Sequence, residues 1–423
     1  MTLTHPRVVA ALTLPALAGL VLAGCAASGG EADDSESFTF TYAVANTGTS
    51  PYEELANAYM KENPNVTIDL TALPNDSYAQ TVLTQVQGGN APDVMLTAAG
   101  SGEQHGIVPL VKANLLAPVD ASAKDLVTPG SESLFEVDGE IYGVPMGITV
   151  SGLVVAGAGL QPLGIDPFPA TLDDFVAKCA DLSKMGMSLI VLAGGAAPNT
   201  GLAAMTIAAG AVYAEEPDWN EQRAAGAVTF ADSEGWRETL DTVVALNDGG
   251  CFQQGSAGAG FDVITTNLQQ QLALGAFIPG NSVGELLTSA PDANWLIQPF
   301  PTESGEPFGI VSSSYALSVP EGARNKDAAQ AFLTWAAQPD QAQMFAELSN
   351  ALPAVGYQDM DLSETVYAPV ADILKNGDFT TVPNSTWPNS AVFDALATGV
   401  QGLLTGQVAP EQVLSDMDTA WDQ

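Results

Sequence analysis

Strands and helices alternate in the first part of the chain, and this alternation constrains the fold more than any other feature. Residues 38–45 alternate apolar with small or polar side chains and predict a strand, and residues 66–70 and 93–96 predict two more. Between them, residues 51–62 and 78–87 carry apolar side chains at helical spacing. Strands separated by helices of this length form βαβ units with a parallel sheet, so the fold class is α/β.

The strand ends indicate where a ligand site would lie. In such sheets, ligands bind at the carboxyl ends of strands beside helix N-termini. This places Asn46, Thr47 and Thr97, which follow predicted strands, near any site. Ser50 and Pro51 supply an N-cap and a first-turn proline, so they predict the start of the first helix.

The first 24 residues have the features of a secretory leader and not of a folded segment. Arg7 precedes an uncharged run that is too short and too interrupted to span a bilayer comfortably, and the run ends at small residues. The segment Leu22-Ala23-Gly24-Cys25 resembles a bacterial lipobox, which implies that Cys25 is diacylated and begins the mature chain. Residues 25–37 are rich in Ser, Gly and acidic side chains, so they predict a lipidated flexible tether.

The charge balance excludes several partners. The sequence holds 49 acidic against 11 basic side chains, with a formal net charge of −38. Nucleic acid and anionic lipid surfaces need clustered cations, so no nucleic acid is expected and the membrane is contacted only through the lipid anchor. The acidic residues are spread along the chain, which is typical of a solvated surface; a cationic ligand is compatible with this charge but not required by it.

Two cysteines remain after Cys25. Cys179 and Cys251 form an even pair in a chain predicted to function outside the cytoplasm, where disulfides persist. We predict that they are bonded; the alternative is two buried thiols.

Several segments, in order along the chain, resemble the extracellular solute-binding proteins of ABC importers. Residues 89–94 (GNAPDV) resemble the family's G-x-APDV motif, and residues 137–145 (VDGEIYGVP) match x-DGKIYGVP closely. Residues 115–120, 168–175 and 316–348 resemble three further family segments. The chain departs from the family at residues 154–157, which replace a YNKD segment, and at residues 274–282, which lack the tryptophan of the family's cleft segment.

The resemblance implies a two-lobed periplasmic-binding-protein-like fold, in which each lobe is a mixed, mostly parallel sheet flanked by helices. Hinge strands join the lobes near residues 146–151, 308–312 and 350–356. The expected N-lobe combines residues 38–147 with 311–350, and the C-lobe combines 148–310 with 351–423.

The residue inventory disfavours catalysis and cofactors. His105 is the only histidine after the leader, so most hydrolytic and metal-dependent mechanisms lack a necessary group. Residues 280–284 (GNSVG) satisfy the G-x-S-x-G pattern of serine hydrolases, but no histidine follows Ser282. Phosphate-loop and dinucleotide motifs are absent from the sequence, and we expect no metal, no cofactor and no enzymatic activity.

Candidate ligand contacts are polar or aromatic residues at strand ends, helix starts and the hinges. A sugar is held by aromatic faces and by uncharged polar groups on its hydroxyls. The candidates are Asn46, Thr47, Thr49, Asp76, Tyr78, Thr97, Met146, Asn199, Phe277, Asn281, Ser282, Ser312 and Trp387. By contrast, Trp335 lies on an apolar helical stripe and is predicted to be core, whereas Trp219, Trp236 and Trp421 lie in acidic segments and are predicted to be exposed.

The leading hypothesis is a monomeric, lipid-anchored protein that captures a sugar or oligosaccharide by hinge closure. It would deliver the ligand to the transmembrane subunits of an ABC permease. A polyamine or other cation is the nearest alternative ligand, with Asp76 as the natural carboxylate. A secreted glycoside-acting enzyme and a surface adhesion protein are alternatives of other classes.

Overall fold

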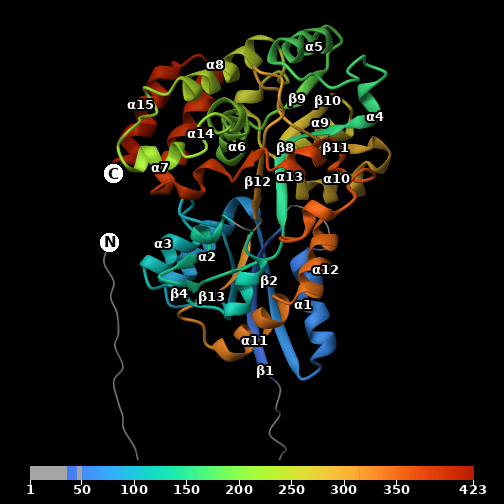
Figure 1. Ribbon diagram of the computed structural model, residues 1–423. Coiled ribbons are helices and arrows are strands. Elements are labelled where there is room, and N and C mark those ends of the chain that lie inside the picture. Colours follow the sequence, from blue (N-terminus) through green and yellow to red (C-terminus); the bar gives the residue numbers. More distant parts are fainter. Residues whose placement is uncertain (1–35, 45–49, 129, 314) are drawn as a thin grey trace, which may run out of the picture. The chain divides into compact units, whose positions relative to one another are not determined.

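Most strands of the described residues form two mixed sheets, each flanked by helices (Figure 1), and one hairpin forms a separate two-stranded sheet. A computed structural model describes residues 36–44, 50–128, 130–313 and 315–423. The predicted leader, lipidation site Cys25 and most of the tether lie outside these residues. Within the described residues, no helix is both long and apolar enough to cross a bilayer.

The N-lobe sheet has the strand order β2-β1-β3-β13-β4, with β7 beside β13. Strand β1 runs parallel to β2 and β3, as the alternating sequence predicted, whereas β13 is antiparallel to β3. The strands are β1 (Glu36–Val44), β2 (Val66–Pro74), β3 (Val94–Thr97), β4 (Leu116–Ala117), β7 (Val144–Pro145) and β13 (Ala316–Pro320). The helices are α1 (Pro51–Glu62), α2 (Asn75–Gln87), α3 (Ile107–Lys112), α11 (Lys326–Ala336) and α12 (Pro339–Ser349).

Helix α1 begins where the sequence predicted. The Ser50 hydroxyl accepts a hydrogen bond from the Tyr52 N–H at 3.3 Å, and Pro51 occupies the first turn. The buried face of α1 places Tyr59 against Phe332 and Trp335 of α11, with ring centroids 5.1 Å apart in both pairs. Trp335 is buried, which confirms its prediction as a core residue.

The family-like segment 137–145 contains a β-hairpin. Strands β5 (Glu136–Val137) and β6 (Glu140–Ile141) pair through a two-residue turn. Asp138 and Gly139 form that turn with φ values of 53° and 85°, a left-handed conformation that Asp-Gly tolerates well. The hairpin leads directly into β7 and so into the connection between the lobes.

Asp93, the aspartate of the APDV motif, ties three segments of the N-lobe together. Its carboxylate accepts hydrogen bonds from the Thr39 N–H at 2.9 Å and from the Arg324 and Asn325 N–H groups at 2.8 Å each. Burial by itself raises the pKa of this carboxyl, but the hydrogen bonds from Asn325 and Thr39 outweigh it and hold the pKa below its ordinary value. The motif therefore anchors β1 and the start of α11 beside β3.

Replacing Asp93 by asparagine is expected to destabilise the protein by about 2–4 kcal/mol, because an amide presents donors to buried N–H donors. The pKa of the Asp93 carboxyl is lower in the folded protein than in the unfolded chain. The stabilisation that Asp93 contributes is therefore present above its unfolded-chain pKa and is lost as pH falls through its folded-state pKa. Urea denaturation between pH 5 and 3 measures the free energy of unfolding of both proteins. The difference between wild type and Asp93→Asn should become smaller toward low pH. The exposed Asp69→Asn in β2 is the control, and an equally large loss there would contradict the assignment.

The C-lobe sheet has the order β14-β12-β8-β10-β9, with β11 also beside β8. Strand β8 is antiparallel to β10, β11 and β12. The strands are β8 (Ile148–Ala156), β9 (Ser188–Val191), β10 (Ala273–Pro279), β11 (Trp295–Gln298), β12 (Gly309–Ser313) and β14 (Phe379–Thr380). The helices are α4 (Gly157–Leu160), α5 (Leu172–Lys184), α6 (Ala197–Ala208), α7 (Trp219–Ala224), α8 (Glu234–Asp248), α9 (Asp262–Gln269), α10 (Val283–Ser289), α13 (Ala371–Asn376), α14 (Ser390–Leu404) and α15 (Pro410–Trp421).

An aromatic cluster fills one side of the C-lobe core. Trp219 and Trp236 are 1% and 0% exposed, so the prediction that they lie at the surface is wrong. Phe230 lies between them, 4.7 Å from Trp219 and 5.2 Å from Trp236 between ring centroids. The acidic residues before Trp219 are exposed and precede α7, and Glu234 is exposed at the start of α8, so the local composition reflects these neighbours and not the buried rings.

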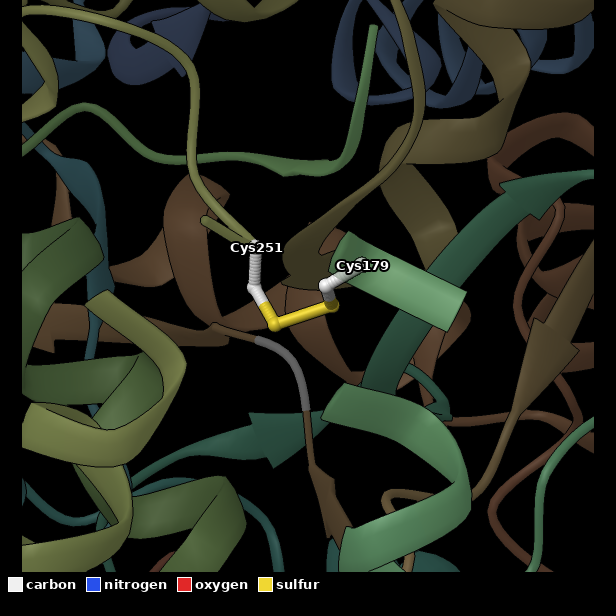
Figure 2. The surroundings of a disulfide bond; sticks show 2 residues. All are labelled: Cys179 and Cys251. Carbon is white, nitrogen blue, oxygen red and sulfur yellow. A yellow bond between two sulfur atoms is a disulfide. The ribbon is translucent and has the colours of Figure 1, made fainter. Parts of the chain in front are cut away.

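Cys179 of α5 and Cys251, which follows α8, form a disulfide (Figure 2). Both residues are fully buried, and the bond joins positions separated by 72 residues. This confirms the predicted pairing. The bond fixes α5 beside the segment that enters the sheet, where the Cys251 carbonyl accepts the N–H of Ile190.

Loss of the disulfide is expected to destabilise the C-lobe by roughly 4 kcal/mol, because a loop of this length has a large closure entropy. The Cys179→Ala/Cys251→Ala double variant should therefore unfold at lower urea concentration when tryptophan fluorescence is followed. Peptides bearing either cysteine should resist alkylation in denaturant until a reductant is added. Alkylation without reductant would contradict the bond.

Candidate functional site

Three strand ends meet at one edge of the N-lobe sheet. Thr97 at the end of β3 lies opposite Ala316 at the start of β13, and Ala316 also lies opposite Pro145 at the end of β7. On the far side of β3, Val44 of β1 pairs with Pro74 of β2 in the same orientation. This edge therefore gathers the carboxyl ends of the parallel strands, where ligands bind in open α/β sheets.

A second set of polar residues lies together at an edge of the C-lobe sheet. Ser312 of β12 lies opposite Thr149 of β8, and the Thr149 hydroxyl accepts a hydrogen bond from the Asn281 N–H at 3.0 Å. Asn281 and Ser312 are half-buried, whereas Thr149 is buried. The side chains are a hydroxyl, a hydroxyl and an amide, so this edge offers uncharged donors and acceptors.

The same segments carry the chain between the two sheets. Strand β7 continues through Met146 and Gly147 into β8, and β12 leads into β13. At a third position, Ile148 and Leu352 exchange two backbone hydrogen bonds of 2.9 Å each. A Cβ on Gly147 would lie 2.8 Å from the Leu352 carbonyl oxygen, so glycine permits this close crossing. The two polar edges therefore flank the crossing segments.

The predicted N-lobe contacts have different outcomes. Asn46, Thr47 and Thr49 lie outside the described residues, and Asp76 lies in the first turn of α2. Tyr78 is buried; its hydroxyl accepts from the Leu96 N–H at 2.7 Å and lies 3.1 Å from the Leu96 carbonyl oxygen. This side chain ties α2 to β3 and has no exposed surface for a ligand in this structure.

Thr97 and Met146 also have buried side chains, although both lie at the N-lobe edge. The Thr97 hydroxyl shares a 2.7 Å hydrogen bond with Ser318 of β13. Met146 is 0% exposed and packs in the N-lobe core. Both residues lie at the N-lobe edge, but their side chains are packed against other protein groups and are not exposed to a ligand in this structure.

The predicted C-lobe contacts divide in the same way. The Asn199 side chain accepts the Ala193 N–H at 2.8 Å and donates to the Phe277 carbonyl at 2.7 Å, so it fastens the loop after β9 to β10. Phe277 is buried against Phe300. Only Asn281, Ser282 and Ser312 of the described C-lobe candidates keep part of their side chains exposed.

Trp387 is 0% exposed and belongs to the aromatic cluster of the C-lobe. Its ring lies 5.7 Å from that of Phe230 and 5.9 Å from that of Trp236. Its indole N–H donates to the Asn220 side chain at 3.3 Å. The ring therefore presents no free face to a ligand in this structure.

Residues 45–343 match the profile of the bacterial extracellular solute-binding proteins. The chain belongs to this family. A binding protein of Brucella abortus (strain 2308) is 25% identical over 177 residues, and the match covers 40% of this chain and 40% of that relative.

Solved structures share the fold of this solute-binding protein. One, from work on xylan utilisation by Caldanaerobius polysaccharolyticus, has a TM-score of 0.76 and 21% identity, covering 90% of this chain and 99% of that one. A chitin oligosaccharide binding protein has a TM-score of 0.75 and 20% identity, with coverage of 92% and 98%. A binding protein solved with raffinose has a TM-score of 0.72 and 17% identity, with coverage of 91% and 98%.

Sequence reasoning missed three residues at these edges of the solute-binding protein. Thr149 lies within the predicted hinge 146–151, so its position was indicated but its side chain was not singled out. His105 and Tyr315 flank the N-lobe edge, with ring centroids 5.4 Å apart, and both pack on Tyr78. Their loops carry no motif, so their proximity follows only from the sheet order.

His105 is buried, and its Nε2 atom has no hydrogen-bond partner. Burial lowers the pKa of His105 from its ordinary value of 6.5, and the carboxylate of Glu103, 3.5 Å from Nδ1, opposes this only in part. The other titratable groups packed against the imidazole are the phenols of Tyr78 and Tyr315. The imidazole is therefore neutral at neutral pH.

Acidification below pH 6.5 is expected to destabilise the protein through His105. The unfolded chain takes up the proton first, so the free energy of unfolding falls by up to about 1.4 kcal/mol per pH unit as pH drops toward the folded pKa. His105→Gln should remove this slope between pH 6.5 and 5, whatever its effect on absolute stability. Parallel stability curves for wild type and variant, measured by urea denaturation, would contradict the prediction.

Two hollows of the described chain lie away from these edges. One of about 670 Å³ is open to solvent and lined by residues of α5, α6 and α8 and by residues 300–303. The other, of about 260 Å³, lies around Pro339 and Val355. Neither hollow is lined by a predicted ligand contact. The candidate site is therefore assigned from the polar edges of the N-lobe and C-lobe sheets.

Proposed function

We propose that this solute-binding protein captures a sugar or oligosaccharide between its two sheet edges and delivers it to the permease of an ABC importer. The observation that carries the proposal is the uncharged C-lobe edge formed by Thr149, Asn281 and Ser312. A charged ligand requires an opposite charge in its site, whereas hydroxyl and amide groups suit sugar hydroxyls. Structures described as binding chitin oligosaccharide and raffinose share the fold over more than nine-tenths of the chain, which supports the same ligand class.

The proposed ligand contacts come from both lobes. Asn281, Ser282 and Ser312 supply the C-lobe side, and Asn46, Thr47, Thr49 and Asp76 follow β1 and β2 on the N-lobe side. The crossing segments act as the hinge, so ligand binding shifts an equilibrium between open and closed arrangements. Nothing is chemically converted: the protein is a carrier and not an enzyme.

Lipidation of Cys25 completes the proposal. After removal of residues 1–24, two acyl chains would hold the protein stably at the membrane, and residues 26–37 would separate the lobes from the lipid. A monomer tethered in this way remains near its permease partner. This arrangement is supported by the lipobox-like sequence and by membership of an extracellular family.

Thermal denaturation with a ligand panel tests the proposed ligand class. Raffinose, acarbose and a chitin oligosaccharide form the sugar set, and putrescine and spermidine form the cation set. A ligand at 100 times its dissociation constant should add about 2.7 kcal/mol to the free energy of unfolding. Stabilisation by the polyamines alone, or sugar hydrolysis detected by chromatography, would contradict the proposal.

The site is tested in the same assay. Asn281→Ala should weaken sugar binding by about tenfold, since a hydrogen bond in a closed site contributes roughly 1–1.5 kcal/mol. Asn376→Ala, at an exposed position of α13, is the matched control and should bind as wild type does.

A further inference from the structure

The two lobes touch at a second place, beside the crossing segments. The N-lobe loop (residues 98–106) follows β3, and the C-lobe segment (residues 383–387) comes soon after β14. The Ser101 N–H donates to the Ser385 carbonyl at 2.7 Å, and the Ser101 hydroxyl donates to the Trp387 carbonyl at 2.6 Å. One residue of the N-lobe loop therefore makes two short hydrogen bonds to the backbone of the C-lobe.

Glycines permit this contact. A Cβ on Gly102 would overlap the carbonyl oxygen of Asn384, and one on Gly100 would overlap that of Ser385. Gly100 has φ +81°, which already favours glycine, whereas the backbone of Gly102 lies outside the left-handed region. The only feature that requires glycine at position 102 is the approach of the other lobe.

Both partners are held rigidly within their own lobes. In the N-lobe loop, the Gly100 N–H donates to the Leu134 carbonyl at 2.8 Å. In the C-lobe segment, the Pro383 carbonyl accepts from the Asn220 side chain at 2.8 Å, and Trp387 is buried in the aromatic cluster. A change in the angle between the lobes must therefore break the Ser101 bonds, because neither side can follow the other without losing contacts of its own.

The contact lies close to the hinge, so it can influence lobe closure directly. Thr97, just before the N-lobe loop, pairs with Ala316 of β13, and Thr380, just before the C-lobe segment, pairs with Ile310 of β12. The two loops thus extend from strands adjacent to the β12–β13 crossing.

We propose that Ser101 and Gly102 are affinity-determining residues that stabilise the lobe arrangement of this structure without contacting the ligand. The inference rests on the proposed capture of a ligand by lobe closure. Ligand affinity then depends on the free energy of this lobe-to-lobe contact, because the apparent affinity follows the population of the binding-competent arrangement.

The test compares Gly102→Ala and Ser101→Ala with the control Gly322→Ala, whose added Cβ would meet only Ala91 at 3.8 Å. Hydrogen exchange of the peptides covering residues 98–106 and 383–387, measured without sugar, reports on the contact whether or not a sugar binds. Dissociation constants for raffinose, acarbose and a chitin oligosaccharide, together with the melting temperature of the unliganded protein, complete the set.

For Gly102→Ala we expect faster exchange in both peptides, no faster exchange in β1 and β8, and a dissociation constant changed at least about tenfold for whichever sugar of the panel binds. Ser101→Ala should change the dissociation constant in the same direction by a smaller factor, and Ser101→Thr should restore the wild-type value. Unchanged exchange, or an unchanged dissociation constant, in Gly102→Ala would overturn the proposal. So would faster exchange throughout β1 and β8 with a lowered melting temperature, because the residue would then be structural. If no sugar of the panel binds the wild type but both peptides exchange faster in Gly102→Ala, the proposed ligand class is wrong, whereas the lobe-to-lobe contact at Gly102 is supported.

Discussion

The fold depends on one antiparallel pairing that belongs to both lobes. Strand β7 pairs with β13 in the N-lobe sheet, and the same two stretches of chain pair again as β8 and β12 in the C-lobe sheet. Because side chains alternate across a strand, a shift of one residue in this pairing would reverse which side chains face each core. The register that places Pro145 opposite Ala316 and Ile148 opposite Ser313 therefore also determines which polar groups reach the two edges.

Much of the polar chemistry near these edges fixes the backbone. Gln253 donates to and accepts from the backbone of Leu192, and Asn199 links Ala193 to Phe277. Asp93 does the same in the N-lobe with several N–H donors. Loops held in this way lose little conformational entropy when a ligand binds, so fastening them supports affinity even where the fastening side chain is buried.

The sequence was sufficient for the βαβ order and the start of α1, because each follows from local patterns. It named Cys179 and Cys251 as a pair but left two buried thiols as the alternative to a bond. It was insufficient for side-chain roles at the site. Asn199 and Tyr78 lie in the first turns of helices that follow strands, where either ligand contact or backbone fastening would suit the same residue type. Only the distances to Ala193, Phe277 and Leu96 distinguish the two roles. Trp387 stands between prolines and resembles a loop residue, yet its partners Phe230 and Trp236 are more than 150 positions earlier in the chain and could not be inferred locally.

Buried charge shows why the acidic composition is a poor guide to the ligand. Arg223 is 6% exposed and lies within 3.3 Å of Asp418 and 2.9 Å of Asp422, with its guanidinium 5.2 Å from the centre of the Trp421 ring. Asp418 also accepts the Phe230 N–H at 2.9 Å, so this carboxylate holds the fold together, unlike the solvated acidic surface that the composition indicates. One of the few cations is thus used to fasten α15 to the aromatic core. Where carboxylates and cations serve the fold in this way, net charge does not identify a ligand, and the uncharged groups at the strand edges carry more information about specificity.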